Sequence, residues 1–439
     1  MTEITRRDAL KIGAGTAAFA ATGVDALAQG APKWEVTPEK GASIRVLRGS
    51  RFVQGDETVF NENVAKYEKA TGVKVRVDYE GWEDITPKAA VAANVGKGPD
   101  IVYGWYDIAH QYPDKLVDVS DVANYLGAKY GGWFDVCKKF GQTKGGRWIA
   151  IPLGAPGSKV VYRISHAKEA GFSEFPKDTK GFLALCQAMK KANKPVGLAL
   201  GNAVGDANGW CHWVVWAHGG KMVNEKDQVV INSPETIAGL EYAKELYQTF
   251  VPGTLSWLDP SNNKAFLDDQ LSLTTNGISV YYSIKNSADP KIKAMAADVG
   301  HADYPIGPVG RSTQLNLIVP AMVFRYSKYK NAAKDFIRFM MEQEQYEPWS
   351  TASIGYFSHP LAAYDKLPIW TADPKHTPYR DTMRTMLWPS YAGSLGYASA
   401  GALADFIMVQ MVATACSGAK SPKDAAAEAQ KRAERYYKV

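Results

Sequence analysis

Residues 98–107, GPDIVYGWYD, join a strand-like run to side chains that could hold a small molecule. The apolar run 101–103 predicts a buried strand, and Trp105, Tyr106 and Asp107 follow it directly. A chain that leaves a strand normally turns through glycine, proline, asparagine or aspartate with small polar neighbours. Two rings and a carboxylate here predict a binding surface, although aromatic rings more commonly cap the local core.

Two earlier segments end in the same way. Residues 43–47 and 73–77 alternate as strands, and helical spacing follows each of them. This alternation predicts an α/β fold with a mostly parallel sheet, whose ligands lie beyond the carboxyl ends of the strands. Three strand ends that each carry an aromatic and a charged group favour ligand-facing loops over core capping. The candidates on these loops are Arg51, Trp82, Trp105, Tyr106 and Asp107.

The second half of the chain repeats the strand and helix pattern and adds polar candidates. In GDANGW, Asp206, Asn208 and Trp210 stand within five residues of one another in a glycine-rich loop. Asp206 or Asn208 could cap the following helix or contact a ligand, and one side chain could do each job. Asn276 begins another candidate loop. If residues 277–282 are extended, Tyr281 and Tyr282 point opposite ways, so only one of them can face a cleft.

The amino terminus and the totals limit the class of protein. Arg6-Arg7, an Ala/Gly-rich run and Ala26-Leu27-Ala28 predict that residues 1–28 are a twin-arginine-like export signal that is removed, rather than an amphipathic helix. The remainder is too long for one ordinary core and suits two lobes of roughly 150–200 residues. The net charge of +6 comes without long basic runs, which argues against a nucleic-acid partner. Four widely spaced cysteines favour buried thiols over a disulfide scaffold.

The motifs of the common hydrolases and nucleotide-binding enzymes are absent. The sequence has no HExxH, GxSxG or P-loop, and its seven histidines show no ligand or triad spacing, so no metal or cofactor is expected. Asp107 and Asp206 could in principle be the two carboxyls of a glycosidase. A glycosidase does not need two separate lobes, so an enzyme is the weaker interpretation.

The order of several modest motifs resembles one family. KYEKATGVKVRVDY, GKGPDIVYGWYD, WIAIPLG, TTNGISVYY and AAKDFIRFM are similar to segments of bacterial extracellular solute-binding proteins of family 1, the maltose-binding-protein-like receptors of ABC importers. The resemblance implies a two-lobe periplasmic-binding-protein fold of type II, in which each lobe is a mostly parallel sheet flanked by helices and a hinge joins the lobes. The implied lobes are residues 41–152 plus 308–348 and residues 153–307 plus 349–439.

The resemblance also implies a function and a partner. It implies a monomeric periplasmic protein that closes on a sugar, oligosaccharide or polyol and delivers it to an ABC permease in the inner membrane. An aromatic face packs on the C–H patch of a sugar, and polar groups orient its hydroxyls. Gln314 could contribute from the hinge side, with an ordinary polar loop as the alternative. A late aromatic could be Tyr356 or Trp388.

Other ligand classes stay open at this point. Gly154-Ala155-Pro156 lies where maltodextrin-binding members present an acidic contact, and this departure puts a maltose specificity in doubt. Arg48, Arg51, Arg147 and Arg163 could serve an acidic or sulfonated sugar derivative or another non-sugar solute. An amine site should surround its ligand with several carboxylates, and these loops do not show them.

Overall fold

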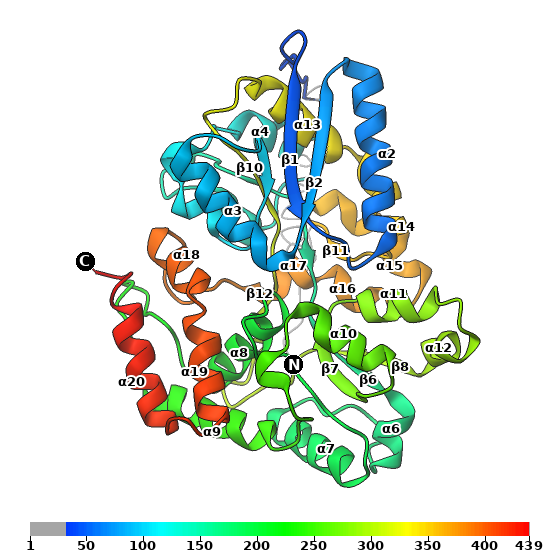
Figure 1. Cartoon of the computed structure of the whole chain (residues 1–439), viewed down its shortest axis with the longest axis vertical. Coiled ribbons are helices and arrows are strands. Elements are labelled where there is room, and N and C mark those ends of the chain that lie inside the picture. Colours follow the sequence, from blue (N-terminus) through cyan, green and yellow to red (C-terminus); the bar gives the residue numbers. More distant parts are fainter. Residues whose placement is uncertain (1–31, 439) are drawn as a thin grey trace, which may run out of the picture.

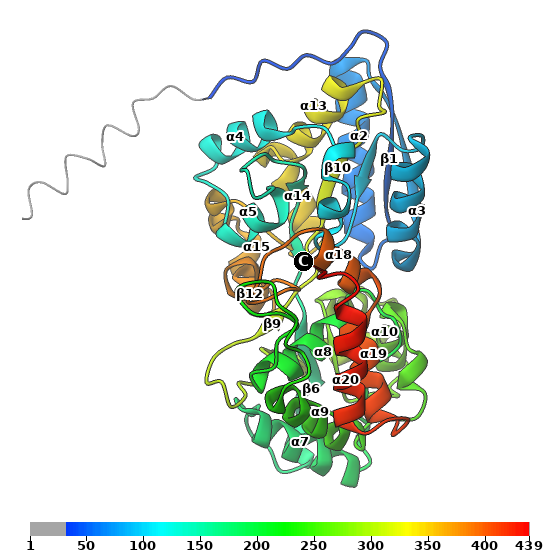
Figure 2. The same ribbon diagram turned by 90° about the vertical axis from the view of Figure 1, so that its left-hand side faces the viewer.

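The computed structural model describes residues 32–438, which form two lobes stacked along the long axis of the molecule (Figure 1). The expected export signal, residues 1–28, lies outside the described residues. Turning the molecule by 90° shows a narrower waist between the lobes, where β9 (Gln314–Leu315) pairs in parallel with β12 (Met386–Leu387) (Figure 2). The two-lobe α/β architecture expected from the sequence is therefore confirmed.

The first lobe is built on a five-stranded sheet in the order β2-β1-β3-β10-β4. β1 pairs in parallel with both β2 and β3, so the strand order reverses at β1, and β10 runs antiparallel to β3. A reversal of strand order is where ligands of open α/β sheets bind. The strands are β1 (Ser43–Gly49), β2 (Lys74–Glu80), β3 (Ile101–Tyr103), β4 (Ile151–Pro152) and β10 (Pro320–Val323).

Two crossover helices connect the parallel strands and lie on opposite sides of them in Figure 1. α2 (Gln54–Thr71) joins β1 to β2, and α3 (Trp82–Val95) joins β2 to β3. Each helix ends at a glycine in the left-handed region, Gly72 with φ 74° and Gly96 with φ 67°, a conformation that glycine adopts without strain. The order of strands and helices predicted for residues 43–103 is confirmed. Further helices of this lobe are α4 (Ser120–Lys129), α5 (Asp135–Gly141), α13 (Lys330–Met340) and α14 (Gln343–Ala352).

The sheet of the second lobe differs from the expected parallel one. Its strands β6 (Lys159–Arg163), β7 (Leu273–Asn276) and β8 (Val299–Ala302) pair antiparallel on both sides of β6. Apolar runs predict that a strand exists but carry no information on its direction, which explains the error. The helices α7 (Thr179–Lys191), α8 (Asp206–Ala217), α9 (Pro234–Tyr247), α10 (Asp259–Leu267) and α11 (Ser279–Lys285) surround this sheet.

Residues 349–372 pack on the first lobe rather than on the second, to which the resemblance assigned them. The indole of Trp349 bonds to Asp56 of α2, Phe134 N bonds to the carbonyl of Pro360, and Leu361 forms a bridge with Trp133. The apolar side chains of this segment belong to the same buried cluster as the core of the first lobe. The other lobe boundaries stay predictions.

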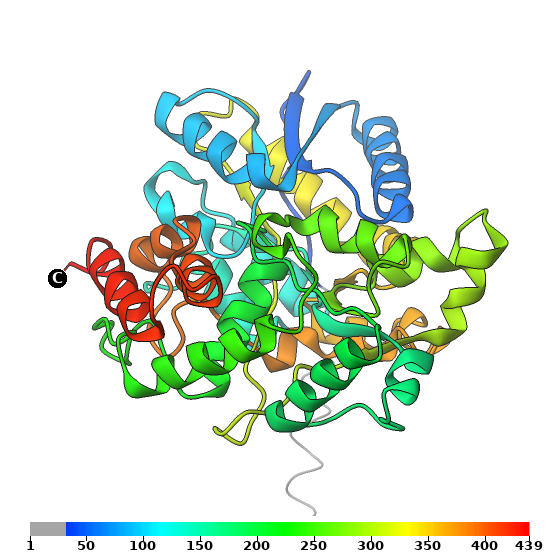
Figure 3. The ribbon, with the colours of Figure 1, turned by 60° about the horizontal axis from the view of Figure 1, so that its bottom comes forward.

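The C-terminal helices cover one side of the second lobe. α19 (Ile407–Cys416) and α20 (Pro422–Ala433), red in Figure 3, lie beside the green helices α8 and α9. Residues 397–416 are long and apolar enough to cross a membrane by length and composition, but 56% of that stretch is buried inside the protein. The stretch is also interrupted, because α18 (Tyr397–Ala404) ends before Phe406, which adopts φ 51°. Burial and interruption identify it as part of the protein interior. The four cysteines are buried and free, as expected.

Candidate ligand-binding cleft

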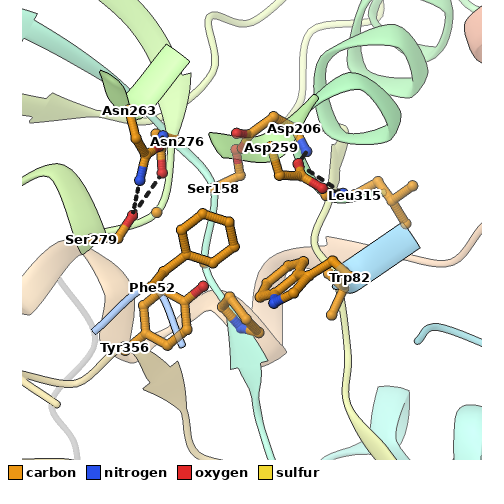
Figure 4. A pocket seen from close by; sticks show the side chains of 15 residues that line it. Phe52, Trp82, Ser158, Asp206, Asp259, Asn263, Asn276, Ser279, Leu315 and Tyr356 are labelled. Carbon is orange, nitrogen blue, oxygen red and sulfur yellow. Dashed lines mark hydrogen bonds between the residues drawn. The ribbon is translucent and has the colours of Figure 1, made fainter. Parts of the chain in front are cut away.

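The segments that follow β1 and β2 face the second lobe and enclose a small central cavity with it (Figure 4). Phe52 comes from the first loop and Trp82 from the second, and Tyr356 approaches from the segment after α14. The second lobe supplies the polar wall. The lining residues with polar side chains in that wall are Ser158, Asp206, Asp259, Asn263, Asn276 and Ser279.

The aromatic wall is a set of mutually packed rings. Phe52 lies edge-on to Trp82, with ring centroids 4.8 Å apart, and the Trp82 ring lies 4.6 Å from that of Trp105. Hydrogen bonds fix both indoles, because Trp82 Nε1 donates to Ser50 O at 2.9 Å and Trp105 Nε1 donates to Trp82 O at 2.8 Å. A Cβ atom on Gly49 would lie 2.7 Å from the Trp105 ring. Glycine at the end of β1 therefore allows the indoles to pack there.

The polar wall is organised by the amino terminus of α8. The carboxylate of Asp259 accepts hydrogen bonds from Gly205 N at 3.0 Å and Asp206 N at 2.8 Å. Asp206 Oδ2 in turn accepts from Asn262 Nδ2 at 2.9 Å. Burial raises the pKa of Asp259 to about 6, and burial together with the charge of Asp259 raises that of Asp206 above its usual range.

An amide and hydroxyl network lies beside the two carboxyls. Asn276 Oδ1 accepts from the Ser279 hydroxyl at 3.0 Å, and Asn263 Nδ2 donates to the same hydroxyl at 3.1 Å. Asn276 Nδ2 also donates to Asn263 Oδ1. Figure 4 shows this network across the cavity from the rings of Phe52 and Tyr356. The central cavity therefore has aromatic faces on one side and hydrogen-bonding groups on the other.

A second, first-lobe cavity lies behind the aromatic wall and holds a buried ion pair. Arg48 Nη2 donates to both carboxylate oxygens of Asp56, at 2.8 and 2.6 Å, and the Arg48 guanidinium lies 4.2 Å from the centre of the Phe60 ring. Arg48 Nη1 and the hydroxyl of Tyr103 are buried without a partner and line the same cavity. These two polar groups therefore have no hydrogen-bond partner among residues 32–438.

A third, side cavity of about 310 Å³ adjoins the central one. Three pairs of consecutive residues contribute one member to each cavity: Trp82 and Glu83, Gly205 and Val204, Asp259 and Leu258. Tyr106 and Phe406 line the side cavity with φ of 52° and 51°, and strained backbone of this kind gathers at functional sites. Pockets for small molecules typically measure about 300–1,000 Å³.

The side cavity holds acceptors that have no donor. Asp107 and Asn208 are 1% and 2% exposed, and within residues 32–438 Oδ1 of each has no hydrogen-bond partner. Ser399 donates to the other Asp107 oxygen at 2.5 Å. Burial raises the pKa of Asp107 to about 7, against the lowering effect of the Ser399 bond. This side chain therefore lacks both a cation and a second donor.

Direct hydrogen bonds hold the lobes together in a closed form. Tyr106 OH of the first lobe donates to Val204 O at 3.0 Å, and Tyr282 OH of the second accepts from Gly55 N at 3.1 Å. The central cavity has a volume of only about 30 Å³, enough for about two waters. A solute larger than this can enter the central cavity only when the lobes separate.

The structure brings most of the predicted site residues to these cavities. Trp82, Asp206, Asn276 and Tyr356 line the central one, and Trp105, Tyr106, Asp107 and Asn208 line the side one. The sequence allowed Asp206 and Asn208 either to cap the following helix or to contact a ligand. Both residues lie in cavity walls. Asp259, not either of them, bonds to the amides at the start of α8.

Five predicted site residues lie elsewhere. Trp210 is fully buried in α8, where its indole bonds to Ala199 O at 2.7 Å, because the helix starts at Asp206 and turns this side chain into the core. Tyr282 is in helix α11 rather than in an extended segment, and its hydroxyl contacts Gly55 instead of a cavity. The other three are occupied by local contacts: Arg51 with Glu57, Gln314 with Asp303 and Ser312, and Trp388 with Gly393 O and Lys139.

Several residues that line the cavities were not predicted from the sequence. Asp259 stands in LDPSNN, where Asp-Pro followed by a polar residue signals the start of a helix, so its second role as a cavity carboxyl is hidden. Phe52 follows Arg51 in the same loop and could have been included. Asn263 and Ser279 lie on α10 and α11 and carry no local signal.

The arginines that could have served an acidic ligand have protein partners. Arg48 pairs with Asp56, Arg163 pairs with Asp269 and Asp298, and Arg147 donates to the carbonyl of Pro113. Among the described residues, no arginine, lysine or histidine lines the central or the side cavity.

Two α/β lobes that enclose a cleft of aromatic and polar side chains are typical of solute receptors. Solved structures of solute-binding proteins share the fold of this chain. Maltose-bound MalE3 of T. maritima is 17% identical, with a TM-score of 0.78, over 90% of this chain and 100% of that one. A solute-binding protein of an ABC transporter from Thermotoga lettingae, bound with α-D-tagatose, is 15% identical with a TM-score of 0.76, over 90% and 100% of the two chains.

The chain belongs to the bacterial extracellular solute-binding proteins, whose sequence model matches residues 62–378. The family predicted from the order of the motifs is therefore confirmed. A curated relative, a "Probable ABC transporter-binding protein" of Deinococcus radiodurans, is 24% identical over 213 residues. That alignment covers 46% of this chain and about half the length of the relative.

Proposed function

We propose that this protein is the substrate receptor of an ABC importer and that it binds a hydroxyl-rich solute, a sugar or polyol, between its lobes. The observation that carries this proposal is the central cavity, in which rings from the first lobe face carboxyls and amides from the second. An aromatic face packs against the C–H patch of a sugar, and carboxylates and amides bind its hydroxyls. Structures of the same fold contain maltose, α-D-tagatose and ribitol, which supports this class of ligand.

The proposed ligand contacts are Trp82, Tyr356, Asp206 and Asn276 in the central cavity, with Trp105, Tyr106, Asp107 and Asn208 in the side cavity. A ligand that touches both lobes stabilises the closed form, which the permease would recognise. The protein would act in the periplasm as a monomer after export by the twin-arginine-like signal. It would change nothing chemically.

A thermal-shift screen tests this function. A neutral sugar or polyol present at 100 times its dissociation constant should stabilise the folded protein by about 2.7 kcal/mol. Tyr356→Ala should remove the shift because the ring forms part of the aromatic wall, whereas Tyr397→Ala, which changes a 69% exposed ring, should keep it. An unchanged shift in Tyr356→Ala would place the ligand elsewhere, and turnover of a glycoside would contradict the receptor role.

A further inference from the structure

The ionisable groups that line the central and side cavities are all acidic or phenolic. Asp206 and Asp259 line the central cavity, and Glu83 and Asp107 line the side cavity. Neither Asp206 nor Asp259 has a lysine, arginine or histidine within 4.0 Å in the part of the chain that the structure describes. The nearby guanidinium of Arg48 is already matched by Asp56. The cleft therefore has acidic groups without a matching cation among the described residues.

Buried carboxylates without a counter-charge are costly, so they must be protonated or paired. Asp206 is 8% exposed and Asp259 is 3% exposed. Glu83 raises the pKa of Asp259 further, and the two carboxyls themselves raise the pKa of nearby tyrosines. These tyrosines are Tyr106, Tyr304, Tyr356 and Tyr379, and neither they nor Glu83 supply a positive charge. Burial accordingly raises the pKa of both carboxyls. A bound cation would neutralise these two carboxylates in place of the protons that they otherwise hold.

The opposite wall and the side cavity suit the same cation-bearing guest. Phe52, Trp82 and Tyr356 present rings to the space beside the carboxyls, and a cation over an aromatic face is favourable, most of all when water is excluded. In the side cavity the buried atoms without a hydrogen-bond partner among residues 32–438 are all oxygens: Asp107 Oδ1, Asn208 Oδ1 and Glu83 Oε1. A guest rich in N–H and O–H donors satisfies these oxygens.

We infer that the solute is a hydroxylated amine, such as an amino sugar or amino alditol, whose ammonium group binds Asp206 and Asp259 against the ring of Trp82. This inference rests on the proposed receptor function and narrows its ligand class. Its central-cavity carboxyls come from the start of α8 and the start of α10, two segments that are 53 residues apart in the chain. That separation is why no single loop of the sequence shows the cluster.

Isothermal titration calorimetry at pH 7 on the full mature chain tests the inference with matched pairs of probes. The pairs are D-glucosamine and D-glucose, 1-amino-1-deoxy-D-sorbitol and D-sorbitol, and the β-1,4-linked glucosamine disaccharide and cellobiose. At least one amine should bind ten or more times more tightly than its neutral partner. Titration in two buffers of different ionisation enthalpy should show proton release on amine binding, because the ammonium replaces protons on the carboxyls.

Asp206→Asn keeps an oxygen for Asn262 while it removes the charge, and should weaken amine binding at least tenfold. Asp114→Asn, which changes an exposed carboxylate of the first lobe, is the matched control and should bind as the unaltered protein does. If Asp206→Asn fails to fold, the proton count of the unaltered protein still decides the question.

The outcomes separate the two proposals. Neutral partners that bind as tightly as the amines, or amine binding without proton release, overturn the amine inference and leave the receptor function standing. A panel in which neither amines nor neutral compounds bind overturns the inference and contradicts the proposed class of hydroxyl-rich ligand as well.

Discussion

Asp56 and Glu57 are adjacent carboxylates in the first turn of α2, but only one of them is in the protein interior. Asp56 is 2% exposed and accepts both bonds from Arg48 together with the indole N–H of Trp349. The side chain of Glu57 is 22% exposed, and that of its partner Arg51 is 45% exposed. The same type of ion pair therefore occurs in two environments within one turn of helix.

Asp56→Asn should lower the free energy of unfolding by about 3–5 kcal/mol, because the Arg48 charge would stay buried without a counter-charge. Glu57→Gln, the matched exposed change, should cost about 1 kcal/mol or less. Urea denaturation of the two variants measures both values. Equal losses would contradict the role assigned to the buried pair.

Asp107→Asn should change how stability depends on pH. The folded protein holds the Asp107 proton up to about pH 7, whereas the unfolded chain releases it near the usual value of 3.8. This group therefore reduces stability progressively as pH rises between about 4 and 7. Asparagine stays neutral, so the variant should gain stability relative to the unaltered protein across this window and level off above it. Thermal unfolding at pH 5, 6, 7 and 8 measures the difference; a difference that does not vary with pH would contradict the raised pKa.

At the scale of the elements, the start of α2 makes one of the contacts between the lobes. The start of α2 lacks a side-chain cap of its own, and Gly55 N there donates to Tyr282 OH from α11 at 3.1 Å. The hydroxyl can accept this bond only while the lobes are closed. Tyr282 thus contributes to closure rather than to direct ligand contact.

Tyr282→Phe should weaken ligand affinity by about 2- to 10-fold, since a net hydrogen bond is worth about 0.5–1.5 kcal/mol and the closed form would lose it. Tyr397→Phe, on an exposed ring, is the control and should leave affinity unchanged. Titration calorimetry with the strongest ligand from the screen measures both. Unchanged affinity in Tyr282→Phe would show that this bond does not favour the closed form.

Elements with strong local signals were predictable, and those defined by tertiary contacts were not. The apolar spacing between Trp82 and Val95 and the stop at Gly96 gave the bounds of α3 directly. The apolar run of residues 196–200 is typical of a strand, but it forms only isolated bridges at Val196, because the neighbouring segments do not continue a ladder there. The direction of β6 against β7, and the placement of residues 349–372 on the first lobe, depend on partners more than 100 residues away.

Site residues with a local sequence signal were predicted, and those that depend on tertiary packing were not. Trp82 and Trp105 were predicted because each follows the carboxyl end of a strand, and ligands of open α/β sheets bind at that edge. Asp259 was missed because its local pattern describes a helix start equally well. Trp210 was misplaced because a single turn of helix decides whether its ring faces the core or the cleft.

At the scale of the whole molecule, the two lobes close on a cavity that is smaller than a sugar. The aromatic wall belongs to the first lobe and the carboxyl wall to the second, so neither lobe alone forms the site. Opening must precede binding, and a ligand that touches both walls must favour closure over opening. Lobe closure and ligand binding are therefore coupled.

A crystal structure with the ligand that gives the largest thermal shift tests this account most directly. We predict that the ligand lies between the ring of Trp82 and the carboxyls of Asp206 and Asp259, in contact with both lobes. A ligand found on one lobe alone, with Trp82 and Asp206 not in contact with it, would contradict the account.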